Sequence, residues 1–307
     1  MSYFKSSGFF CLFFVFIFWF LNITFSIFIS NSQITTILIY FCLAAVSLVY
    51  LLLCGRNIVQ TLRLHKMNVL SLLLILVLSA VIRPLTGFVS LAGNLLFQDI
   101  VSSSITEELS HGLGIMLFST ALLPGIVEEL IFRGVIYSGM RKANPIKGIL
   151  LSSLFFGLAH MNFQQFCYAF VLGIILGVLV EATDSLFASM LLHAVFNGTS
   201  LILTYLMTLM PSFSRIASEQ TSGSAFQNNL ASMTALLPAA LISLILSVLL
   251  IMAIAHLNGR LGYIKTWFSS RIRSTWPKEK AASLSYFAAV GICIFFAAAT
   301  ELLMRIA

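Results

Sequence analysis

Charged residues are scarce in this sequence. Only 9% of its 307 residues are Asp, Glu, Lys or Arg, whereas 60% are hydrophobic. Soluble globular chains carry roughly 25% charged and roughly 45–50% apolar residues, and disordered chains are poor in apolar residues. The composition therefore excludes both classes and predicts a protein that resides in a lipid bilayer.

The residue patterns of disulfide frameworks and common metal sites are also missing. The five cysteines are odd in number, include no C-x-x-C pair and lie within or beside apolar runs, so we expect small buried hydrophobic residues. No His-Glu-x-x-His sequence occurs, although that sequence is typical of zinc proteases. No internal repeat of the kind found in many secondary transporters is evident.

Long apolar runs dominate instead. A transmembrane helix needs about 20 apolar residues, and the run at 147–161 is the shortest of those present. We therefore predict an all-α fold, a polytopic transmembrane helical bundle of about eight or nine spans. The runs lie near residues 8–30, 34–54, 68–92, 112–140, 147–161, 163–183, 185–209, 233–257 and 282–304.

Basic residues are distributed unevenly among the loops. With the N-terminus in the cytoplasm, 13 of the 17 Lys and Arg residues fall in inner loops, as the positive-inside rule requires. We predict an integral membrane protein with a cytoplasmic N-terminus, and we expect it in the plasma membrane of a bacterium. The rule also accounts for the net charge of +7, so no nucleic-acid partner is expected. Basic and aromatic residues in the inner loop 258–281 suit contact with the lipid bilayer, and the oligomeric state is left open.

Three ionisable residues lie deep in the fourth apolar run, in the sequence EELIFR. Each costs roughly 2.5–3.5 kcal/mol at the centre of a membrane helix, so such residues are kept for pairing or function. Glu129 and Arg133 are four residues apart and share a helix face, so Arg133 can neutralise Glu129. Glu128 lies about 100° around the axis and is free to face the bundle interior.

Two further runs carry polar residues at a similar depth. Phe156 and His160 stand four residues apart, and so do His193 and Asn197. With a rise of 1.5 Å per residue, Glu128, His160 and Asn197 lie roughly 18 Å, and His193 roughly 12 Å, from their cytoplasmic helix ends. We therefore expect Glu128, His160, His193 and Asn197 to meet in one layer of the bundle, around an intramembrane catalytic cavity.

This set of side chains suits hydrolysis by an activated water molecule. Glu128 would be the general base, assisted by His160, and His193 with Asn197 would stabilise the oxyanion. No cofactor is expected beyond the catalytic water. Zn²⁺ is the alternative, because Glu128, His160 and His193 could nominally bind it, although an Asn amide is a weak ligand.

The ordered motifs E-E-x-x-x-R, F-x-x-x-H and H-x-x-x-N resemble those of the CPBP family. That family, also called ABI or glutamic intramembrane endopeptidases, comprises CAAX prenyl endopeptidases and bacteriocin-processing or self-immunity proteins. The resemblance covers roughly residues 110–205 and implies a helical membrane protease without an obligatory metal. The site residues that it implies are Glu128 and His160 for the water, His193 and Asn197 for the oxyanion, and Glu129, Arg133 and Phe156 in support.

The expected partner is a membrane-embedded peptide or a lipidated protein. Candidate substrates are a prenylated C-terminus, a bacteriocin or signalling-peptide precursor, and a membrane-protein segment. A non-catalytic scaffold or immunity factor and a proton-coupled transporter are the alternatives. We expect about three N-terminal spans and an outer segment in residues 1–110, the catalytic core in 111–209, and an outer loop, two spans and a basic cytoplasmic loop in 210–307.

Overall fold

The computed structural model describes residues 3–99, 112–209, 225–280 and 282–306, and the regular structure in these residues is entirely helical. The predicted all-α fold is therefore confirmed. Eight segments are long and apolar enough to cross a membrane. They are α1 (Tyr3–Phe28), α2 (Ser32–Leu53), α4 and α5 (Val69–Val81 and Arg83–Asn94), α7 to α9 (Leu113–Met140), α11 (Phe163–Thr183), α12 (Leu186–Thr208), α14 (Ala225–Leu257) and α17 (Leu284–Ile306).

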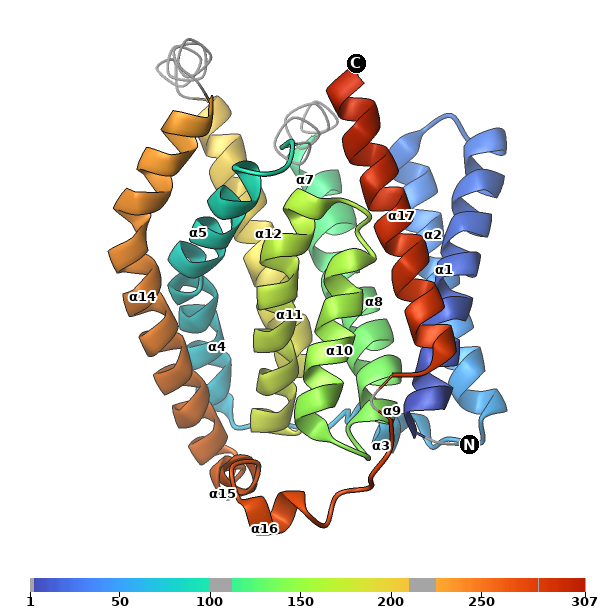
Figure 1. The fold of residues 1–307 in the computed structure, drawn as a ribbon, viewed down its shortest axis with the longest axis vertical. Helices are drawn as coiled ribbons and strands as arrows, with labels where there is room; N and C mark the ends of the chain where they lie inside the picture. Colours follow the sequence, from blue (N-terminus) through green and yellow to red (C-terminus); the bar gives the residue numbers. More distant parts are fainter. Residues whose placement is uncertain (1–2, 100–111, 210–224, 281, 307) are drawn as a thin grey trace.

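A shorter helix, α10 (Pro145–Leu158), runs antiparallel to α11 beside it (Figure 1). Asn144 caps its start by accepting a hydrogen bond from the Lys147 N–H, and Pro145 occupies the first turn, where no N–H is needed. Met161 adopts a left-handed backbone (φ 52°) and Asn162 caps α11. These local signals end α10 after 14 residues, so the predicted short segment at 147–161 exists as a helix.

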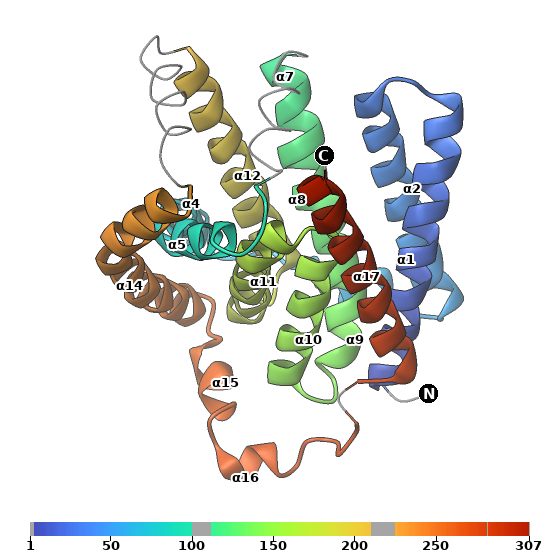
Figure 2. The ribbon, with the colours of Figure 1, turned by 45° about the horizontal axis from the view of Figure 1, so that its top comes forward.

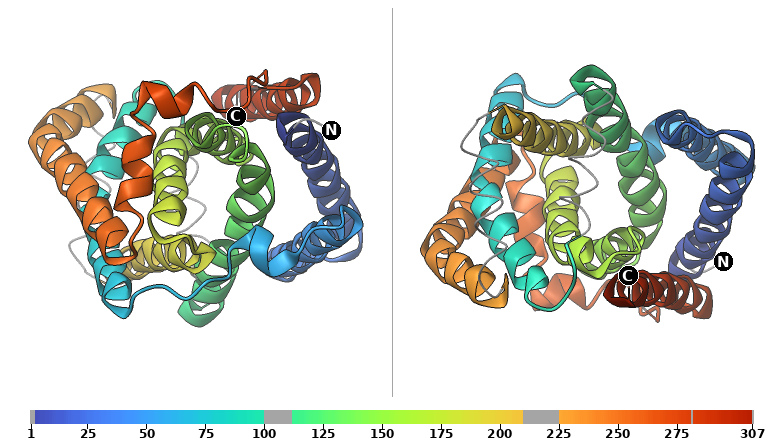
Figure 3. Two further views of the ribbon diagram at one scale, coloured as in Figure 1. Left: turned by 90° about the horizontal axis from the view of Figure 1, so that it is seen from below. Right: turned by 90° about the horizontal axis from the view of Figure 1, so that it is seen from above.

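Three layers of helices form the bundle (Figure 3). The central layer holds α7 to α12, with α1, α2 and α17 on one side and α4, α5 and α14 on the other. Short helices α3 (Ile58–Leu62), α15 (Leu261–Thr266) and α16 (Ser270–Arg273) lie at the end of the bundle that carries the N-terminus (Figures 1 and 2). The expected boundary at residue 110 and the start of the expected 210–307 part lie outside the described residues.

Small residues let α10 and α11 pack closely. A Cβ atom on Gly173 would lie 2.9 Å from the Ser153 Cβ, and one on Gly177 would lie 3.2 Å from Ile149. Both glycines lie on the same face of α11 because they are four residues apart. The tight contact holds α10, which leads into the turn that carries His160, against α11.

The fourth span contains two π-helical stretches, which the sequence did not predict. They are η2 (Leu117–Leu122) and η3 (Leu130–Tyr137), and α8 (Leu123–Glu129) lies between them. π-Helical turns widen a helix by one residue per turn and occur frequently at functional sites. The two acids expected to carry the chemistry stand at the junction of α8 and η3.

Candidate active site

The two acids of the fourth span have different surroundings. Glu129 is fully buried, and its Oε1 lies 2.6 Å from Nη1 of Arg133. Arg133 is also buried, and its Nη2 donates a hydrogen bond to the carbonyl oxygen of Gly173 at 3.1 Å. The pair expected from the four-residue spacing is thus present. Glu128 forms no ion pair with an arginine in the described residues and keeps 16% of its side chain exposed.

His193 on α12 bridges the two acids. Its Nδ1 lies 2.9 Å from Oε1 of Glu129, and its Nε2 lies 3.9 Å from Oε2 of Glu128. Because Arg133 holds Glu129 as a carboxylate, Nδ1 donates its proton to that carboxylate. Nε2 then donates a hydrogen bond only when the ring is protonated on both nitrogens.

A glycine brings α12 against α8 at this level. A Cβ atom on Gly125 would lie 2.8 Å from both the Cβ and the backbone N of Ala194, the residue after His193. The preceding Pro124 has no N–H to donate to the carbonyl of Thr120. Nδ2 of Asn197 donates to that carbonyl at 3.3 Å instead. Pro124 and Gly125 therefore help to position His193 and Asn197 on α12.

His160 lies in the turn that follows α10. Its Nδ1 is 2.9 Å from the carbonyl oxygen of Phe156, and because a carbonyl only accepts hydrogen bonds, Nδ1 carries the proton. Nε2 of the neutral ring is then a free acceptor. The buried Phe156 ring contacts His160 and His193 edge-on, with centroids 5.1 Å and 5.8 Å apart, and lies 4.4 Å from the Arg133 guanidinium carbon.

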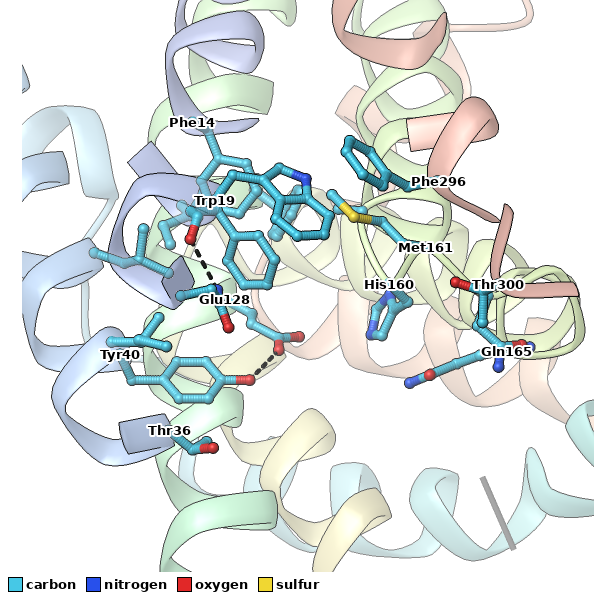
Figure 4. Close-up of a pocket in the computed structure, with 18 residues that line it drawn as sticks. Phe14, Trp19, Thr36, Tyr40, Glu128, His160, Met161, Gln165, Phe296 and Thr300 are labelled. Atoms are coloured by element: carbon cyan, nitrogen blue, oxygen red, sulfur yellow. Dashed lines mark hydrogen bonds between the residues drawn. The ribbon is translucent and has the colours of Figure 1, made fainter. Parts of the chain in front are cut away.

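A cavity of about 630 Å³ joins Glu128 and His160. Figure 4 shows both side chains pointing into it, Glu128 from α8 and His160 from the α10–α11 turn. Residues of α1, α2, η3 and α17 form most of its wall, and most of these residues are aromatic or aliphatic, which is the usual character of a ligand site. His193 and Asn197 do not line the cavity but stand behind Glu128 on α12. The structure thus joins Glu128, Glu129 and His193 directly and holds Asn197 one helical turn away.

The nominal zinc ligands are not arranged as a metal site. In the part of the chain that the structure describes, no three His, Cys, Asp or Glu side chains gather so as to hold a metal ion. Nδ1 of His193 is bonded to Glu129. Nδ1 of His160 is bonded to a backbone carbonyl. Both rings are thus oriented by other partners.

Comparison with known proteins gives one match. Residues 110–199 match the family described as type II CAAX prenyl endopeptidase Rce1-like. This segment is similar to an Rce1-like domain and is called the Rce1-like domain below. The CPBP resemblance is thereby confirmed in its CAAX endopeptidase branch, and the match supports an intramembrane endopeptidase, a hydrolase. The Rce1-like domain covers 90 of the 307 residues, from 110 to 199. No curated protein and no solved structure matches the chain.

A residue from outside the Rce1-like domain contacts Glu128 in the cavity. The hydroxyl group of Tyr40 on α2 donates a hydrogen bond to Oε1 of Glu128 at 2.6 Å (Figure 4). Sequence reasoning missed this residue because it stands in an apolar run without any motif. A tyrosine in a membrane span often lies at the interface, so residue type alone gave no signal.

A second buried acid lies at the end of the bundle that carries the N-terminus. Glu181 on α11 accepts hydrogen bonds from Tyr137, Arg63 and Arg141 and forms a further ion pair with Arg260. Burial by itself lowers the pKa of Arg141, but the Glu181 carboxylate raises it above its usual value. The cluster ties α3, α9 and α15 to α11 and contributes nothing to the cavity wall. In the sequence, this cluster is indicated only by Glu181, the one acidic residue within the predicted 163–183 span.

Proposed function

We propose that the protein is an intramembrane endopeptidase in which Glu128 activates a water molecule to hydrolyse a peptide bond. One observation carries this proposal: of the two adjacent acids, Glu129 is neutralised by Arg133, whereas Glu128 faces the cavity that His160 also lines. The family match supports the endopeptidase class.

The proposed reaction uses the proton positions derived above. Glu128 takes a proton from water while Nε2 of His160 accepts the other O–H and orients it. The hydroxide adds to the scissile carbonyl, and His193 and the free N–H of Asn197 stabilise the resulting oxyanion. When the C–N bond breaks, Glu128 returns the proton to the leaving nitrogen. Glu129, Arg133 and Phe156 hold the two imidazoles in place.

The substrate that we propose is an apolar or lipid-modified peptide. The cavity wall is mostly aromatic and aliphatic, with Trp19 on α1 and Phe296 on α17 in ring contact at 4.1 Å. Such a wall favours a prenylated C-terminus, and a bacteriocin or signalling-peptide precursor or a membrane-protein segment would suit it as well. No cofactor takes part in this scheme.

Hydrolysis of a farnesylated peptide by the purified protein tests this function. We expect cleavage of a peptide that ends in a farnesyl-cysteine tripeptide, with product release measured by mass spectrometry. A set of apolar peptides without the prenyl group identifies the alternative substrate classes. Lack of hydrolysis of every peptide, with the protein folded, would favour the scaffold reading.

The same assay separates the water mechanism from the zinc mechanism. We expect activity to survive extended treatment with EDTA and phenanthroline, because the histidines are oriented by protein partners rather than gathered as ligands. Stoichiometric zinc in the active protein, with activity lost on its removal and restored by its return, would assign the reaction to the metal class.

Tyr40 is proposed as a positioning residue for Glu128. In Tyr40→Phe we expect kcat to fall roughly tenfold or more, since a hydrogen bond to a charged group contributes about 1.5–3 kcal/mol. KM should change little, because the ring and its packing remain. Tyr168→Phe removes a hydroxyl group outside the cavity wall and is the matched control. An equal fall in both variants would contradict this role.

The orientation that we propose places the N-terminus in the cytoplasm of a bacterial cell. The α2–α4 connection, the α9–α10 loop and the α14–α17 connection lie at the same end of the bundle as the N-terminus (Figure 1), and they carry most of the basic residues. A cysteine introduced at residue 270 should resist impermeant thiol reagents in intact cells, and one at residue 30 should react. The opposite labelling would reverse the orientation.

A further inference from the structure

A second cavity lies on the opposite side of the central layer from the active-site cavity. It measures about 450 Å³ and is formed by α5, α11, α14 and α15. Figures 1 and 3 show the first three helices side by side, with α15 across their ends. Its wall is apolar except for Ser247 and Lys265, and Lys265 is its only charged lining residue. It shares no lining residue with the active-site cavity.

The short helix α15 presents one face to this cavity. Its lining residues Leu261, Ile264 and Lys265, together with Phe268 just beyond its end, follow the spacing i, i+3, i+4, i+7 of a single helix face. Trp267 points elsewhere and is buried. The orientation of α15 is therefore fixed by packing, and Lys265, which lines the cavity, is also exposed.

Water is a poor occupant of this space. A buried water molecule needs two to four polar partners, and the wall offers almost none. In a membrane the available apolar filler is a lipid chain, and exposed side chains of α14, Val248 and Met252, border the opening.

The positive charge of Lys265 indicates which kind of lipid would fit this cavity. Lys265 forms no ion pair with any carboxylate in the described residues. Its neighbours along the chain, Arg271 and Arg273, add positive charge. A phosphate group is the complementary partner, and anionic lipids are attracted to basic segments at the cytoplasmic surface.

We propose that this cavity is a binding site for an anionic phospholipid. One acyl chain lies between α11 and α14, and the phosphate contacts Lys265. The bound lipid completes the packing of α14 and α15 on the central layer. Because the readout is bound lipid, this inference is independent of the proposed peptidase activity.

Lipid retention by the purified protein tests the site. The full chain in detergent is mixed with phosphatidylglycerol or with phosphatidylcholine of the same acyl chains, and native mass spectrometry counts the bound lipids. We expect one retained phosphatidylglycerol and a higher melting temperature than with phosphatidylcholine. Lys265→Ala should lower the preference about fivefold, which corresponds to about 1 kcal/mol for one lysine near a charged surface. Lys278→Ala, in the same loop and outside the cavity wall, should leave the preference unchanged.

A second pair of variants tests the acyl-chain part of the site. Val248→Trp fills the cavity mouth and should abolish retention of both lipids, whereas Leu249→Trp, exposed on another face of α14, should retain them. Equal retention of the two lipids by the unmodified protein, or equal loss in Lys265→Ala and Lys278→Ala, would overturn the proposal. So would stoichiometric displacement of phosphatidylglycerol by a farnesylated peptide, because the cavity would then hold substrate.

Discussion

Replacing Glu128 by Gln should abolish peptide hydrolysis while leaving the bundle folded. Glutamine has nearly the same shape, and its carbonyl oxygen can still accept the hydrogen bond from Tyr40, but it cannot take a proton from water. General-base catalysis contributes typically 10²–10⁴-fold, so we expect kcat to fall roughly by that factor. Glu128 lines the cavity and has no arginine to leave unpaired in the described residues, so the melting temperature should change little.

Glu301→Gln provides the matched control for this experiment. It makes the same chemical change on α17, where Glu301 pairs with Arg305 and does not line the cavity. We expect unchanged turnover and unchanged melting. If Glu128→Gln keeps kcat within about tenfold of the original, a loss smaller than that expected for a general base, the base is another group. If the melting temperature of Glu128→Gln falls strongly instead, Glu128 has a structural role.

Arg133→Met should strongly destabilise the protein. It leaves the fully buried Glu129 carboxylate without its cation, and breaking a buried pair costs about 3–5 kcal/mol. Turnover should be lost as well, because Glu129 also orients His193. The yield of folded protein and thermal melting in detergent measure the first effect.

The chain contains a second Glu–Arg pair with the same spacing, which serves as the control. Glu301 and Arg305 are 2.8 Å apart, but the Arg305 side chain is 55% exposed, and exposed pairs contribute about 0.2–1 kcal/mol. Arg305→Met should therefore change the melting temperature little. Adding Glu129→Gln to Arg133→Met should restore part of the lost stability, because the buried charge is removed. Equal melting of the two arginine variants would contradict the assigned role of the buried pair.

Features set by local spacing could be predicted from the sequence. The apolar runs predicted the spanning helices, and the short 147–161 run predicted α10. The four-residue spacing predicted the ion pair between Glu129 and Arg133. Each depends on one helix and on the cost of placing polar groups in lipid. The sequence also placed Glu128 and His160 at similar depths, and they line one cavity.

Contacts between helices could not be predicted in the same way. The bond between His193 and Glu129 requires α8 and α12 to touch at Gly125, and nothing in the local sequence indicates which neighbour a glycine faces. Tyr40 reaches Glu128 only because α2 packs beside α8. Asn197 was expected beside the oxyanion, yet its bond to Thr120 follows from the missing N–H of Pro124.

The wall of the cavity that joins Glu128 and His160 has a consequence for the order in which the helical bundle is assembled. Phe296 and Thr300 of α17 line it together with Trp19 and Asn22 of α1, and α1 and α17 pack against each other. Domains form from the N-terminal side as the chain is synthesised, so the acids and histidines are already in the membrane when α17 is still on the ribosome. A nascent chain therefore carries Glu128 and His160 in a cavity with one side open until α17 enters the membrane and completes the wall.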